Sequence, residues 1–108
     1  MESVTAIVPV LNETTALEKT VHILLEENPK EIQEILIVVS PVMTTKESRT
    51  VANRLVSRYA PVIRIIEQHR PFLGGALQDG FDAVHTPYAV MMAADLETDP
   101  HTVRHLIE

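Results

Sequence analysis

Cysteine is absent from this chain of 108 residues. Its absence excludes disulfide bonds, thiolate metal sites and catalysis by a cysteine nucleophile, and it fits a protein of a reducing compartment. Long apolar runs are missing too, because the longest, residues 35–39 and 88–94, are far shorter than the roughly 20 residues of a membrane-spanning helix. The acidic Glu2 stands where a secretory signal carries basic residues. We therefore expect a cytoplasmic chain without a membrane span.

Basic residues are also few. The net charge is −6, from 9 Lys and Arg residues against 15 Asp and Glu residues, and the two halves of the chain share it almost evenly. Without a basic face, the chain is not predicted to bind nucleic acid or anionic lipid. An anionic ligand would need a metal ion or helix N-termini.

The composition that remains is that of an ordinary globular protein, with 45% apolar and 22% charged residues and a mean hydropathy of +0.08. A chain of this length supports one hydrophobic core and not two. We therefore predict a single domain over residues 1–108. The helix expected to start at Pro100 reaches Glu108 without a cap or polar tail, which indicates a truncated C-terminus.

Four apolar runs alternate with three stretches of helical spacing. The expected strands are residues 4–10, 35–39, 62–66 and 88–93, and the expected helices are residues 15–27, 46–59 and 74–84. This alternation predicts an α/β fold, a mostly parallel sheet with helices on both faces and right-handed connections. Ligands of such sheets bind outside the carboxyl ends of the strands. The loops at residues 9–14, 40–45, 67–74 and 93–99 are therefore the candidate site.

The last of these loops is acidic. Asp95 and Glu97 are two apart in an extended segment, so both carboxylates can reach one hard cation such as Mg²⁺ or Mn²⁺. The alternative interpretation is simpler: Asp99 caps a helix that has Pro100 at its first position, and the other acids are solvated. Local sequence alone favours this alternative.

The first and third loops also allow two interpretations. Residues 9–13 end a strand, and a helix cap at Thr14 or Thr15 explains them locally. Gly74 and Gly75 would let backbone N–H groups approach an anion, and Arg70 could neutralise phosphate. Paired glycines more often serve a turn, and a single loop arginine is usually solvated.

Taken in order, four segments resemble the motifs of family 2 glycosyltransferases, including the dolichol-phosphate mannosyltransferase-like members. Residues 7–13 read IVPVLNE and are similar to the family's V-I-P-x-Y-N-E. Residues 34–38 read EILIV and resemble E-I-I-V-V, while residues 73–80 read LGGALQDG and resemble G-x-G-G-A-L-N-x-G. Residues 94–100 read ADLETDP and resemble D-A-D-L-Q-x-D-P. The resemblance covers the N-terminal half of the family's catalytic domain.

This resemblance implies a GT-A fold, in its Rossmann-like half that binds a nucleotide sugar. Pro9, Leu11 and Glu13 would line the nucleoside pocket. Asp95 and Glu97 would bind Mg²⁺ or Mn²⁺ across the donor diphosphate, and the metal would act as a Lewis acid for the leaving nucleoside diphosphate.

Ser40, Arg70, Gly74 and Gly75 complete the expected donor contacts. Two positions depart from the family pattern. Residues 38–42 read VVSPV where the family has V-D-D-G-S, which leaves Ser40 in place of the aspartate that reads the nucleobase. Ala93 replaces the first aspartate of the metal triplet, which shifts the metal role to Asp95 and Glu97.

The implied reaction is inverting sugar transfer to an acceptor hydroxyl or lipid phosphate, on a glycan or polyprenyl phosphate. The family's acceptor site and catalytic base lie in the second half of its domain, so we expect residues 1–108 to bind donor without turnover. In a full-length protein the domain would work at the inner face of the membrane. Self-association through an apolar patch or sheet edge is a further expectation.

Two other interpretations stay open. The chain could be a non-catalytic α/β binding or assembly domain derived from a glycosyltransferase, which would explain Ser40 and Ala93 at positions where catalysis needs acids. A sugar-phosphate nucleotidyltransferase is the third, although the first loop lacks the glycines and arginines of that class.

Overall fold

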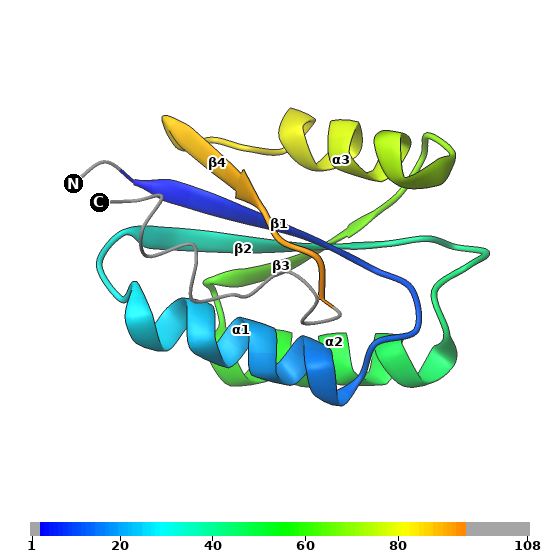
Figure 1. Cartoon of the computed structure of the whole chain (residues 1–108), viewed down its shortest axis with the longest axis horizontal. Coiled ribbons are helices and arrows are strands. Elements are labelled where there is room, and N and C mark those ends of the chain that lie inside the picture. The colour runs from blue at the N-terminus through cyan, green and yellow to red at the C-terminus, as the bar shows by residue number, and fades with distance from the viewer. Residues whose placement is uncertain (1–2, 95–108) are drawn as a thin grey trace.

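A computed structural model describes residues 3–94, which form a parallel four-stranded sheet with helices on both faces (Figure 1). The strands are β1 (Val4–Val10), β2 (Ile32–Val39), β3 (Ile63–Glu67) and β4 (Tyr88–Met91). The helices are α1 (Thr15–Glu27), α2 (Lys46–Tyr59) and α3 (Phe72–Asp82). The predicted fold class is confirmed.

The order of the strands explains why the helices divide between the two faces. The sheet runs β3-β2-β1-β4, and every neighbouring pair is parallel. The connections through α1 and α2 step outward from β1 to β3, whereas the connection through α3 returns across the sheet to β4. Because such connections are right-handed, a connection that crosses the sheet in the opposite direction must place its helix on the opposite face. Figure 1 shows α1 and α2 below the sheet and α3 above it.

Two apolar cores result, one on each face of the sheet. Consecutive strand residues point to opposite faces, so Val8 joins the core under α1 and α2 while its neighbour Ile7 joins the core under α3. Both side chains are fully buried. The central strands β1 and β2 therefore read as continuous apolar runs rather than as alternating ones.

Helix α3 differs from the prediction. It begins at Phe72 rather than Gly74, and Phe81, expected on its buried face, is 45% exposed. Leu77 packs on the core as predicted, but Gly80 rather than Phe81 faces the sheet: a Cβ atom placed on Gly80 would lie 2.6 Å from Cγ2 of Ile7. This close approach rotates Phe81 outward. The helix expected from Pro100 lies outside the described residues.

The three helices of residues 3–94 contain 13, 14 and 11 residues. None of them combines the length and the apolarity of a membrane span.

Thr44 ties together the loops that follow β1 and β2. Its buried Oγ1 donates a hydrogen bond to the carbonyl oxygen of Val10 at 2.7 Å and accepts one from the N–H of Ser40 at 2.6 Å. The N–H of Thr45 donates to the carbonyl of Leu11 at 2.8 Å. These bonds hold the carboxyl ends of the two central strands together.

Replacing Thr44 by valine should lower the free energy of unfolding by about 1–3 kcal/mol, because a buried N–H and a buried carbonyl lose their partner at unchanged side-chain volume. Urea unfolding measures the change. Thr50→Val is the matched control, since the Thr50 hydroxyl is exposed and bonds only to its own helix. We expect less than about 0.5 kcal/mol there. Equal losses in both variants would show that the Thr44 bonds do not support the loops.

Candidate functional site

The carboxyl ends of the strands open into a cleft of about 690 Å³. All four predicted loops contribute to its walls. Its lining includes Pro9, Leu11, Glu13, Ser40, Val42, Met43, Arg70, Phe72, Leu73, Ala93 and Ala94. The cleft therefore lies where ligands of open parallel sheets bind.

The mouth of this cleft is unusually apolar. Five large apolar side chains that line it are between 49% and 87% exposed, namely Leu11, Val42, Met43, Phe72 and Leu73. They come from three different loops. Exposed apolar side chains gathered around a concavity are typical of a binding site rather than of a plain protein surface.

Pro9, Leu11 and Glu13 all lie on the cleft. The Glu13 carboxylate accepts a hydrogen bond from the N–H of Leu11 at 2.8 Å. The Glu13 carbonyl accepts another from Ser48 Oγ at 2.6 Å. Thr14 occupies the N-cap position of α1 without a side-chain bond. Glu13 therefore shapes this loop and is not merely part of a helix cap.

Ser40 is placed at the cleft by the end of β2, but its hydroxyl oxygen already serves the loop. Oγ accepts hydrogen bonds from the N–H groups of Val42 at 3.3 Å and Met43 at 3.0 Å. The Ser40 carbonyl accepts from Arg49 Nη2 at 3.0 Å. Ser40 thus builds the turn that presents the two apolar side chains, and no carboxylate stands at this strand end.

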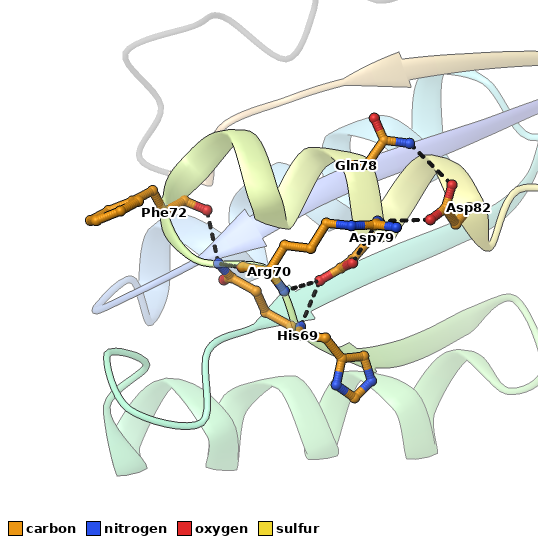
Figure 2. Close-up of polar contacts among 7 residues, drawn as sticks. His69, Arg70, Phe72, Gln78, Asp79 and Asp82 are labelled. Carbon is orange, nitrogen blue, oxygen red and sulfur yellow. Dashed lines mark hydrogen bonds and ion pairs between the residues drawn. The ribbon is translucent and has the colours of Figure 1, made fainter.

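Arg70 lies at the cleft but is not a free cation. Figure 2 shows its guanidinium against α3, where Nη1 donates to Asp79 Oδ1 at 2.9 Å and to Asp82 Oδ2 at 2.7 Å. The hydrogen bond from Arg70 lowers the pKa of the Asp82 carboxyl below its ordinary value. One cation and two carboxylates give the cluster a charge of −1.

Asp79 is the residue that sequence reasoning missed. Its side chain is 8% exposed, and Oδ2 accepts hydrogen bonds from the backbone N–H groups of His69 at 2.6 Å and Arg70 at 3.0 Å. The bonds from the Arg70 and His69 backbone lower the pKa of Asp79. Asp79 therefore anchors the β3–α3 loop, which forms one wall of the cleft. The sequence did contain a signal for this contact: Asp79 and Asp82 are three residues apart on a helix that begins just after Arg70.

Gly74 and Gly75 form part of the first turn of α3, yet they play different parts. A Cβ atom on Gly75 would lie 2.4 Å from the carbonyl carbon and oxygen of Arg70, whereas one on Gly74 would meet nothing within 4 Å. Gly75 also donates its N–H to the carbonyl of Pro71 at 3.2 Å. Neither glycine is among the residues that line the cleft. Gly75 serves the close packing of the loop, and Gly74 leaves open space.

Asp95 and Glu97 lie outside the described residues. Ala93 and Ala94, which directly precede them, line the cleft. Within residues 3–94, no three His, Asp or Glu side chains are grouped so that they could hold a metal ion.

Gly75→Ala should lower the free energy of unfolding by about 1–3 kcal/mol, because the new methyl group collides with the Arg70 carbonyl. Gly74→Ala is its matched control and should leave stability unchanged or raise it by up to about 1 kcal/mol through helix propensity. Thermal or urea unfolding of the two variants measures both effects. Similar behaviour of the two variants would contradict the division of roles.

Solved structures show the same fold. A mannosyltransferase, PcManGT from Pyrobaculum calidifontis, solved in complex with GDP-Man and Mn²⁺, aligns with a TM-score of 0.76 and 21% identity over 99% of this chain. Glucosyl-3-phosphoglycerate synthase from Mycobacterium tuberculosis, solved with Mn²⁺, UDP and phosphoglyceric acid, aligns with a TM-score of 0.68 and 18% identity over 86% of this chain. The alignment covers 33% of the length of each of those chains.

These alignments confirm the GT-A fold that the motifs implied. None of the curated proteins matches this chain significantly. The family model described as glycosyl transferase family 2 matches residues 5–108, nearly the whole sequence. The chain therefore belongs to glycosyltransferase family 2.

Proposed function

We propose that this chain is the donor-binding part of a glycosyltransferase that holds a nucleoside diphosphate sugar together with Mg²⁺ or Mn²⁺. The observation that carries the proposal is the cleft at the carboxyl ends of the strands, whose wall includes Ala94, the residue before Asp95. The two similar structures, solved with GDP-Man and Mn²⁺ and with UDP and Mn²⁺, support this ligand class.

The apolar side of the cleft is suited to the nucleoside. Pro9 and Leu11 from one loop and Val42 and Met43 from the next provide apolar surface for the base. Since Ser40 Oγ is occupied by its own turn, contact with the base here rests on packing and not on a carboxylate. The Glu13 carboxylate keeps Leu11 in place through its backbone N–H.

Asp95 and Glu97 are the proposed metal ligands, because two hard carboxylate oxygens suit Mg²⁺ or Mn²⁺ and the segment entering them borders the cleft. When bound, the metal would supply Lewis acidity to the leaving diphosphate. Arg70 is the cation at the edge of the same cleft, and Gly74 leaves space beside it at the start of α3.

The reaction that we propose for the whole protein is inverting transfer of the sugar to an acceptor hydroxyl or a lipid phosphate. Glu13 is the only carboxylate that lines the cleft in residues 3–94, and it already accepts the Leu11 N–H. The family resemblance places the base for a hydroxyl acceptor in the second half of the family's catalytic domain, and we propose the same here. On this proposal, residues 1–108 bind donor without turnover; multiple turnovers by this segment alone would contradict it.

A second candidate function is a non-catalytic binding or assembly domain. The Ser40 hydroxyl, which accepts two hydrogen bonds from its own turn at a position where the family carries an acid, favours it. The two candidates differ in whether a donor binds at all.

Titration of the protein with UDP-, GDP- and dTDP-sugars by calorimetry, with and without Mn²⁺, separates them. We expect manganese-dependent binding to at least one donor and a loss of about tenfold or more in Asp95→Ala, because a ligand to the metal is removed. Asp99→Ala in the same loop is the control and should bind like the wild type. Absence of binding to every donor would favour the assembly domain.

Phe72 carries backbone strain at the lip of the cleft. Its φ angle is 65°, in the left-handed region, and its ring is 86% exposed. A side chain in this region costs about 1 kcal/mol relative to glycine, and burial of the ring does not offset the cost here. Strained residues of this kind recur at ligand sites. We propose that the ring packs against the bound donor.

Phe72→Gly should therefore raise the free energy of unfolding by about 1 kcal/mol while weakening donor binding by about threefold to tenfold. Phe81→Gly, another exposed phenylalanine of α3, is the matched control. It should lose about 1 kcal/mol of stability and leave donor binding unchanged. Destabilisation by Phe72→Gly would show that the strain is absent.

A further inference from the structure

A second cavity of about 340 Å³ adjoins the cleft and is lined by Ile66, His69, Arg70, Asp79, Asp82 and Ala83. Two of these residues, His69 and Arg70, also line the cleft. The Arg70 side chain thus stands on the boundary between the two cavities. Figure 2 shows it lying along α3, with its guanidinium bonded to Asp79 and Asp82, which line the smaller cavity and not the cleft.

The charge of Arg70 matters because cations are scarce at this site. Of the cleft residues that the structure describes, Arg70 is the only arginine or lysine. Its guanidinium is held by the carboxylates of Asp79 and Asp82, which line the smaller cavity, so the cluster carries a net charge of −1. Both bonds come from Nη1, so an anionic ligand gains these two N–H donors only when a carboxylate gives way.

The two carboxylates differ in how firmly they are held. Asp79 is 8% exposed and is fixed by two backbone N–H groups in addition to the guanidinium. Asp82 is 54% exposed, and its other oxygen accepts only a bond from Gln78 Nε2 at 3.1 Å. An ion pair between half-exposed side chains contributes little free energy. The pair between Arg70 and Asp82 is therefore the one that a ligand can replace.

The loop does not depend on the guanidinium for its position. Asp79 binds the backbone N–H groups of His69 and Arg70, and Gln68 Nε2 donates to the carbonyl oxygens of Arg70 at 2.5 Å and Phe72 at 2.8 Å. These bonds involve only the backbone of residues 69–72. The Arg70 side chain can consequently turn away from Asp82 while the wall of the cleft stays in place.

We propose that Asp82 is a positioning residue that holds the Arg70 guanidinium out of the cleft until a nucleoside diphosphate replaces Asp82 as its partner. The inference rests on the proposed function. A diphosphate offers the guanidinium two oxygen acceptors and more negative charge than one carboxylate, which makes the exchange favourable. Asp82 therefore competes with the ligand for Arg70.

The test is calorimetric titration of the wild type and Asp82→Asn with UDP and with GDP in the presence of Mn²⁺. Removing the competing carboxylate should tighten binding by about twofold to fivefold, the range expected for a half-exposed ion pair. Asp82→Ser should show the same gain, which guards against a defect of one variant. A merely structural role for Asp82 predicts weaker binding instead.

Arg70→Gln supplies the control. In that background, the further change Asp82→Asn should leave the affinity unchanged, because the residue for which Asp82 competes is gone. A gain that persists without Arg70 would show a general effect of net charge and would overturn the inference. Unchanged or weaker binding in Asp82→Asn and Asp82→Ser would overturn it too.

A second measurement follows the exchange directly in the wild type. Since the bond from Arg70 lowers the pKa of Asp82, loss of that bond should raise the Asp82 pKa when nucleotide is bound, as NMR titration of the carboxyl carbon would show. An unchanged pKa in the complex would overturn the exchange.

The outcomes separate this inference from the proposed function. If no variant binds any nucleotide, the proposed function itself is wrong. If the wild type binds and Asp82→Asn shows no gain, only the exchange is wrong.

Discussion

Parallel pairing of β1 with β2, both buried on their two faces, is the constraint from which the site follows. The pairing aligns Val10 with Val39, so both strands end at the same edge of the sheet. Parallel pairing of β3 with β2 and of β4 with β1 brings their carboxyl ends to that edge as well. Loops that are far apart in sequence meet there, and Thr44 bonds the first two of them together through buried groups.

The third wall of the cleft depends on a different contact, the packing of α3 on the sheet. Small residues let this helix approach β1, with Gly80 against the side chain of Ile7. At the start of the helix, Gly75 lets the chain pass close to the carbonyl of Arg70, and Asp79 holds the N–H groups of the same loop. Close packing and one buried carboxylate thus place the loop that carries Arg70.

Much of the fold could be predicted because its strongest signals are local. Strand β1 and helices α1 and α2 have the predicted bounds, since a continuous apolar run or an apolar stripe is enough to identify them. The predicted buried face of α3 was wrong at Phe81, because the contact of Gly80 with Ile7 joins residues far apart in sequence. No local pattern reports such a contact.

The candidate site was predicted in part for the same reason. The topological rule placed the four loops at one edge, and the order of the motifs identified the family. The partners of Arg70 on α3 and the use of the Ser40 hydroxyl by its own turn depend on side-chain geometry that residue types do not reveal. The metal roles of Asp95 and Glu97 stay predictions.

The charges of the site also bear on why a metal ion belongs in the proposed function. Within residues 3–94 the cleft of this chain, whose net charge is −6, has one arginine, already paired with two carboxylates, and so offers little positive charge to a diphosphate. If Asp95 and Glu97 lie at this site as proposed, they would add negative charge that a divalent cation bound between them and the ligand would offset. Such a site would disfavour a free nucleotide and favour its metal complex, because only the complex reduces the repulsion. On the proposed function, the acidic character of the chain would thus be a condition for metal-dependent donor binding and not an obstacle to it.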